Sequence, residues 1–89
     1  MWRIVRRHAV YNCRDMANQK ARDLSKLGDR VRTLRLERKL SQERLAEEAS
    51  LDRTYISLVE RGRRNPSFTN LQKISRGLKT STSELTKGL

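Results

Sequence analysis

Polar and basic side chains between residues 42 and 67 include several that can contact DNA. Arg53 can form a bidentate hydrogen-bonded pair with guanine O6 and N7, which is worth about 1 to 3 kcal/mol of base discrimination. Thr54 can contact a thymine methyl group or a base edge, and Ser57 can reach a base or a phosphate. Tyr55 can donate its hydroxyl to a phosphate or pack against the domain. If these residues lie on one helix, their side chains would together form a surface that reads DNA bases.

The residues that flank this group are suited to phosphate contacts. Arg63 and Arg64 supply two positive charges, and Asn65 supplies an amide. Gln42 and Ser67 stand where two helices are expected to begin, and the free N–H groups of a helix N-terminus can hold a phosphate. The alternative for such a run of charges is a solvated face. Its place directly after the base-reading group favours contacts to the DNA backbone.

The chain carries few groups that could support catalysis or bind a metal. His8 is the only histidine, and Cys13, the only cysteine, excludes an intrachain disulfide and a cysteine zinc cluster. Three glutamates lie along one expected solvated helix rather than in a pocket: Glu43, Glu47 and Glu48. There is no glycine-rich phosphate loop. We therefore expect no enzyme activity, no metal, no cofactor and no small-molecule ligand.

The elements that would position the base-reading side chains lie between Ser41 and Gly62, in the sequence SQERLAEEASLDRTYISLVERG. This stretch predicts two short helices with a tight corner between them, a helix-turn-helix. The expected caps are Ser41 and Asp52, with Gly62 ending the second helix. Ala46 is expected where the two helices cross, since only a small side chain fits there. The other residues predicted to face inward are Leu45, Ala49, Leu51, Ile56 and Val59.

This motif, with DRTYIS over residues 52–57 and ERGRRNPS over 60–67, resembles the small bacterial and phage repressors of the Xre or Cro/cI family. The resemblance covers about Leu24 to Leu89. Within the family, the chain looks most like the controller proteins of restriction-modification systems. The resemblance implies an all-α, five-helix fold and a cytoplasmic homodimer that regulates transcription by binding double-stranded operator DNA. The family's usual turn glycine is replaced here by Ser50, which would adopt a left-handed conformation at a cost of roughly 1 kcal/mol.

The resemblance also suggests roles for individual residues. Arg35 and Glu60 would form a partly buried ion pair that joins the first helix to the end of the recognition helix. Gln42 would brace the recognition helix against the DNA backbone, and residues 63–65 match the family's backbone-contact loop. The ion pair would be structural, because removing one partner of a buried pair costs about 3 to 5 kcal/mol.

Three further helices are expected around the motif, and no strand-like alternation of useful length occurs. The first helix runs from Leu24 to near Lys39, because Leu24, Leu27, Val31 and Leu34 recur at helical spacing. Ser67 caps a helix whose expected buried residues are Phe68, Leu71, Ile74 or Ser75, and Leu78. Ser81 and Glu84 form a possible capping box for a last helix that would end at Leu89.

Residues 1–23 precede the family core and form a separate basic extension, with six basic and two acidic residues. This extension could be a mobile arm that follows a DNA groove or a frayed tail. Residues 24–89 would form the DNA-binding and dimerisation domain. Ile4, Val5, Ala9, Val10 and Tyr11 give the extension an apolar side that could fold onto the domain or a partner subunit.

The overall composition fits a nucleic-acid partner. The 89 residues carry 21 Lys and Arg against 10 Asp and Glu, a formal net charge of +11, and such an excess points to a polyanion. No apolar run approaches the length of a membrane-spanning helix. The expected dimer surface is formed by apolar residues that exceed what one small domain can bury: Leu78, Leu85 and Leu89.

Two other classes of function remain open. One is an antitoxin or accessory protein whose main partner is another protein. The other is a charge-driven nucleic-acid binder without sequence preference, whose affinity for every duplex would fall as salt rises.

Overall fold

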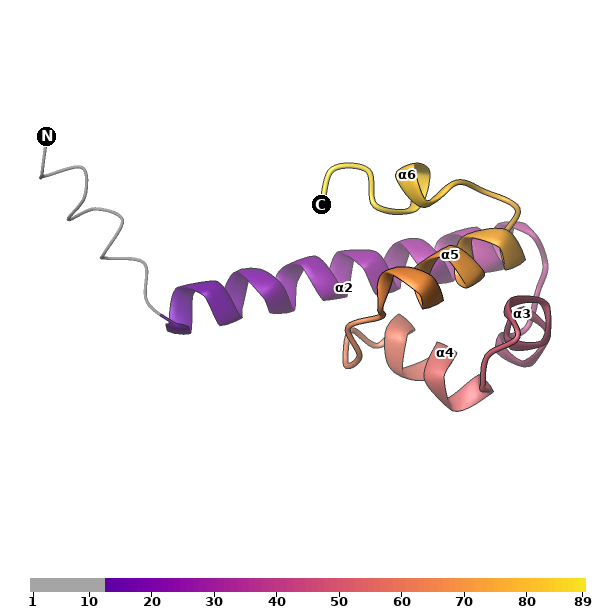
Figure 1. Ribbon diagram of the computed structural model, residues 1–89, viewed down its shortest axis with the longest axis horizontal. Helices are drawn as coiled ribbons and strands as arrows, with labels where there is room; N and C mark the ends of the chain where they lie inside the picture. The colour runs from indigo at the N-terminus through magenta and orange to yellow at the C-terminus, as the bar shows by residue number, and fades with distance from the viewer. Residues whose placement is uncertain (1–12) are drawn as a thin grey trace, which may run out of the picture.

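The computed structural model describes residues 13–89, which form five helices joined by short loops (Figure 1). Their bounds are Cys13–Glu37 (α2), Gln42–Ala49 (α3), Arg53–Glu60 (α4), Phe68–Gly77 (α5) and Thr82–Leu85 (α6). No strand occurs in this part of the chain, so the predicted all-α, five-helix architecture is confirmed. None of these helices is both long and apolar enough to cross a membrane.

The long helix α2 is the support on which the other helices pack. Its C-terminal half contacts α4 and α6, and α3 packs against both α4 and α5 (Figure 1). The shared core is aliphatic and includes side chains with no exposed area, such as Val31, Leu45, Ile56 and Ile74. The shorter helices are therefore held by burial of their apolar faces, since helices of eight residues are not stable alone in water.

The start of α2 differs from the prediction. The helix begins at Cys13 rather than near Leu24, and its first half projects beyond the other helices (Figure 1). Residues 17–22 are all exposed, so this part of the helix has no buried apolar stripe from which the sequence could predict it. They include Ala, Gln, Lys and Arg, which have high helix propensity and can extend a helix that the packed half has already nucleated. Of the extension expected over residues 1–23, residues 1–12 lie outside the described residues.

The predicted helix ends inside the motif are confirmed. Ser41 Oγ accepts a hydrogen bond from Arg44 N at 3.0 Å, and Asp52 accepts one from Thr54 N at 3.1 Å. Ser50 has φ 57° and ψ 44°, the left-handed conformation expected of it. Gly62 follows α4 with φ 72°, while Arg63 N bonds to Leu58 O at 2.9 Å. This closing pattern needs a left-handed residue, which explains the glycine.

The C-terminal helices contain two corrections. Phe68, expected to be buried, is 66% exposed because it is the first residue of α5, and the core covers that helix only from Leu71 onward. Ser67 does cap α5, accepting from Asn70 N at 3.2 Å. The last helix ends at Leu85 rather than Leu89, although Ser81 caps it as predicted, through Glu84 N at 3.0 Å.

Leu78 and Leu85 are not available as a dimer surface, because both are completely buried within the single chain. The chain folds back after α5, so that α6 packs against α5 and α2 and carries Leu85 into the core. The Arg30 guanidinium holds this segment by donating to the carbonyl oxygens of Leu85, at 3.3 Å, and Lys87. Of the three leucines predicted at the interface, Leu89 alone is exposed, at 40%.

Candidate nucleic-acid interface

Helix α4 separates a buried inner side from an exposed outer side. Ile56, Val59 and Glu60 face the interior, whereas Arg53 and Thr54 are exposed in the first turn. Ser57 is half-buried one turn later. Since Arg53 and Ser57 are four residues apart, they share a face of the helix. The structure therefore brings the predicted base-reading residues together on one outward surface.

Tyr55 lies between the two sides of α4. It is half-buried and packs against the core cluster, while the Arg64 guanidinium carbon lies 5.3 Å from the centre of its ring. An arginine at this distance from an aromatic face is attracted by the ring electrons, an interaction worth about 0.5 to 1 kcal/mol at an exposed site. Tyr55 thus packs against the domain, which was one of the two roles expected of it. Its ring also holds the Arg64 guanidinium of the following loop in place.

The loop after α4 presents its side chains to solvent. Arg63, Arg64 and Asn65 are exposed, and none of the described carboxylates lies within salt-bridge distance of the two arginines. Ser67 is also exposed, but its hydroxyl is already occupied as the cap of α5. The loop therefore offers two unneutralised guanidinium groups beside the outer face of α4, an arrangement that favours phosphate oxygens.

A buried polar network fixes the angle of α4. Arg35 Nε lies 2.6 Å from Glu60 Oε2, and Arg35 Nη2 donates to Glu60 Oε1 at 3.1 Å. Each residue is only 9% exposed. Arg35 also donates to the Leu40 carbonyl at 2.9 Å. This bidentate pair links α2 to the last residue of α4, and the further bond satisfies the guanidinium that burial removes from water.

Gln42 joins this network. Its amide nitrogen donates to Glu60 Oε1 at 3.0 Å, so the first residue of α3 is tied directly to the end of α4. The Gln42 side chain was predicted to contact a phosphate. In the structure its amide nitrogen is bonded within the protein instead. Gln42 is still the first residue of α3, so N–H groups of that helix N-terminus lie beside it.

The sequence prediction assigns no role to Arg61, which is exposed at the end of α4, or to Gly28, which is buried in α2. Arg61 continues the Arg53 and Ser57 face of α4, with its Nε directed to the Ser57 carbonyl at 3.4 Å. Gly28 lets α2 and α4 approach closely, because a β-carbon there would lie 2.5 Å from the carbonyl oxygens of Val59 and Glu60. A lone glycine inside a helical pattern was the available signal for the second.

The chain matches the family model described as helix-turn-helix over residues 31–85. It is 49% identical over 61 residues to the control protein C.MunI of a Mycoplasma species, an alignment that spans 67% of this chain and 82% of the relative.

Two solved structures are similar in sequence and fold. The restriction-modification controller protein C.AhdI from Aeromonas hydrophila is 48% identical, with a TM-score of 0.70, over 71% of this chain and 96% of that one. C.Esp1396I bound to a 19-base-pair DNA duplex is 41% identical, with a TM-score of 0.66, over 71% and 84% of the two chains. The family model, the sequence relatives and the folds agree, and the chain belongs to the helix-turn-helix family, as do its controller-protein relatives.

Proposed function

We propose that this protein is a transcription regulator that reads double-stranded DNA with the outer face of α4. The observation that supports this most directly is the orientation of α4. Its inner side is locked to α2 and α3 through Glu60, while Arg53 and Thr54 remain exposed. In helix-turn-helix proteins the first turn of the second helix enters the major groove. Arg53 is then our candidate for guanine recognition, with Thr54 and Ser57 beside it.

The basic loop would place the domain on the DNA backbone. Arg63 and Arg64 would contact phosphates, and Asn65 would add a hydrogen bond. The solved C.Esp1396I complex contains a DNA duplex, which supports the same ligand here. Because the similar proteins are named as control proteins, we propose a controller-like autoregulator of the bacterial cytoplasm.

We further propose that the protein acts as a homodimer. One recognition helix contacts too few bases to select a site in a genome, whereas two copies would read half-sites about 34 Å apart. The partner surface would include exposed Leu89, and it would exclude the two buried leucines first predicted there.

The test is binding of the full chain to the DNA directly upstream of its own gene, with a random duplex of equal length as the control. At near-physiological salt we expect a preference of about a thousandfold or more, with two chains per site. Equal affinity for both duplexes would instead identify a charge-driven binder. Binding of one chain per site would contradict the dimer alone.

A further inference from the structure

Residues 17–22 of α2 form an exposed surface that neither the family model nor the core explains. The helix-turn-helix match begins at Val31, whereas α2 begins at Cys13. Residues 17–22 are exposed along their whole length. This stretch nevertheless lies beside the predicted DNA-contact loop, because Gln19 and Lys20 line a hollow together with Asn65.

The contact between α2 and the end of α4 is close. A β-carbon on Gly62 would lie 3.2 Å from Ser25 Cα, so the turn after α4 rests directly on the α2 backbone. The position of the following loop relative to the first half of α2 is therefore set by backbone packing rather than by long side chains.

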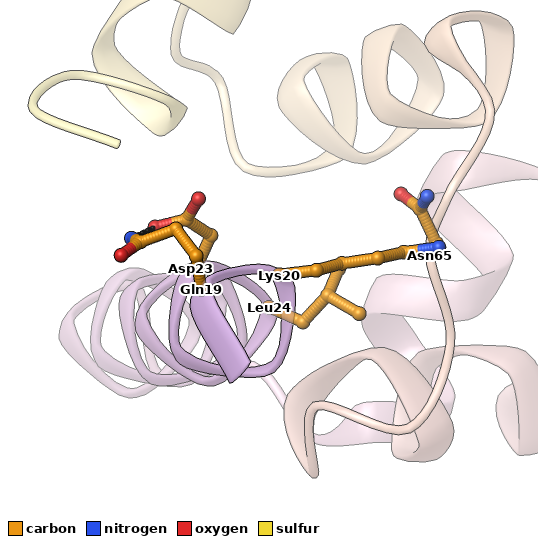
Figure 2. Close-up of a pocket in the computed structure, with 5 residues that line it drawn as sticks. All are labelled: Gln19, Lys20, Asp23, Leu24 and Asn65. Atoms are coloured by element: carbon orange, nitrogen blue, oxygen red, sulfur yellow. Dashed lines mark hydrogen bonds between the residues drawn. The ribbon is translucent and has the colours of Figure 1, made fainter. Parts of the chain in front are cut away.

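Between this half of α2 and the loop lies an open hollow of about 360 Å³ (Figure 2). It is lined by Gln19, Lys20, Asp23, Leu24 and Asn65. Lys20 extends across the hollow to the side of Asn65, as Figure 2 shows. Gln19 and Asp23 lie together at the other side, where Gln19 Nε2 donates to Asp23 Oδ1 at 3.0 Å. The positive group of the hollow is thus directed at the loop, and the carboxylate is held away from it.

Lys20 adds a cation to the basic group formed by Arg61, Arg63 and Arg64. All four side chains are exposed, and among the side chains that the structure describes, no carboxylate forms a salt bridge with any of them. Lys20 shares its hollow with Asn65, the residue that follows Arg64 in the chain. Neighbouring like charges repel one another and favour a polyanion as the partner.

A protein partner fits this surface less well. The apolar side chains exposed over residues 17–22 are those of Ala17 and Ala21, which offer little area for an interface core that is usually aromatic or aliphatic. Charge complementarity therefore selects the phosphate backbone of DNA over a second copy of this chain.

We propose that Lys20, with Asn65, binds a phosphate of the DNA backbone, so that the line of phosphate contacts continues from the loop after α4 onto α2. The proposal rests on the proposed function, since it requires that the outer face of α4 lies on DNA. It assigns a DNA contact to the helical segment that precedes the family domain.

Three variants of the full chain test this contact. Lys20→Ala removes the proposed contact. Arg22→Ala removes the same charge two residues along α2, about 200° around the helix, and is the matched control. Asp23→Asn removes the one carboxylate of the hollow. All three positions are on or near the helix surface, and thermal unfolding monitored by circular dichroism verifies that each variant folds.

The measurement is affinity for a random-sequence duplex of fixed length over a range of salt concentrations. For Lys20→Ala we expect a loss of about five- to tenfold at 0.1 M salt and a slope of log K against log salt that is smaller by about 0.9, the value for one phosphate contact. Arg22→Ala should change affinity by less than about twofold, because an exposed charge away from the DNA is screened. Asp23→Asn should tighten binding.

Equal losses for Lys20→Ala and Arg22→Ala would overturn the proposal, because net charge would then account for both. It would also fail if Lys20→Ala left DNA binding intact but changed self-association in sedimentation without DNA. Failure of the unmodified protein to bind any duplex would reject the proposed function itself, a result distinct from either of these.

Discussion

The inner and outer sides of α4 differ in burial, in charge pairing and in what a substitution there would change. On the inner side, Glu60 is 9% exposed and bonded to both Arg35 and Gln42. On the outer side, Arg53 and Thr54 are exposed. The inner side therefore determines whether α4 is held in place and at what angle it lies against α2 and α3. Under the proposed function, the outer side determines which DNA is bound.

The same division holds for the two kinds of positive charge. The charge of Arg35 is neutralised inside the protein, and water is largely excluded from its ion pair. Arg63 and Arg64 are unneutralised by any described carboxylate and remain in water. Substitutions of the buried charge should change the free energy of unfolding, and substitutions of the exposed charges should change DNA affinity.

The largest expected effect is that of Glu60→Ala. The substitution leaves the buried Arg35 guanidinium without its carboxylate, which should lower the free energy of unfolding by about 3 to 5 kcal/mol. Urea unfolding would measure the loss. Glu47→Ala is the control, because the Arg44–Glu47 pair is exposed at 3.7 Å and should contribute less than about 0.5 kcal/mol.

Replacing both partners sharpens this test. The Arg35→Met and Glu60→Leu double variant removes both charges and should recover most of the lost stability. A loss for Glu60→Ala no larger than that for Glu47→Ala would show that the pair does not hold α4 in solution.

A somewhat smaller effect is expected for Gly28→Ala. Alanine normally stabilises a helix by about 1 kcal/mol relative to glycine. Here its β-carbon would lie 2.5 Å from two backbone carbonyl oxygens of α4, so overpacking should destabilise the protein by about 3 kcal/mol. Asp29→Ala, at the neighbouring exposed position, should change stability by less than about 0.5 kcal/mol. A gain in thermal stability for Gly28→Ala would contradict the close packing of α2 on α4.

The smallest changes in stability, and the largest in binding preference, are expected on the outer side. Arg53→Ala should remove about 1 to 3 kcal/mol of discrimination at one base position. Arg64→Ala should instead weaken all duplexes alike and reduce the salt slope by about one unit. Competition binding against duplexes with single base changes separates the two patterns. If Arg53→Ala weakened cognate and random duplexes equally, Arg53 would be a phosphate contact rather than a base-reading residue.

Local sequence patterns were sufficient for the motif. Ser41, Ser50, Asp52 and Gly62 each adopt the cap or turn conformation expected of them, because caps and tight turns depend on a few adjacent residues. The core faces of α3 and α4 followed from helical periodicity for the same reason.

Sequence patterns did not predict the structure correctly in two situations. In one, a helical segment has no face packed against the core, and in the other, a helix distant in the sequence buries the residue. Residues 17–22 of α2 are exposed and have no buried apolar stripe that could predict a helix there. Phe68 has the right spacing for burial, but the core does not cover its position. Leu85 appeared to be surplus apolar surface because nothing local shows that α6 folds back onto α2 and α5.

Residue order alone thus determined the helix-turn-helix, its caps and the basic, polar composition of its outer face, all of which depend on neighbours within about four positions. Tertiary packing decided which leucines are buried, how closely Gly28 lets α2 approach α4, and that Lys20 lies beside Asn65. Gly28 and Val59 are 31 positions apart in the chain, and Lys20 and Asn65 are 45 positions apart. Their distances depend on how the helices stack, and no short-range pattern encodes that geometry.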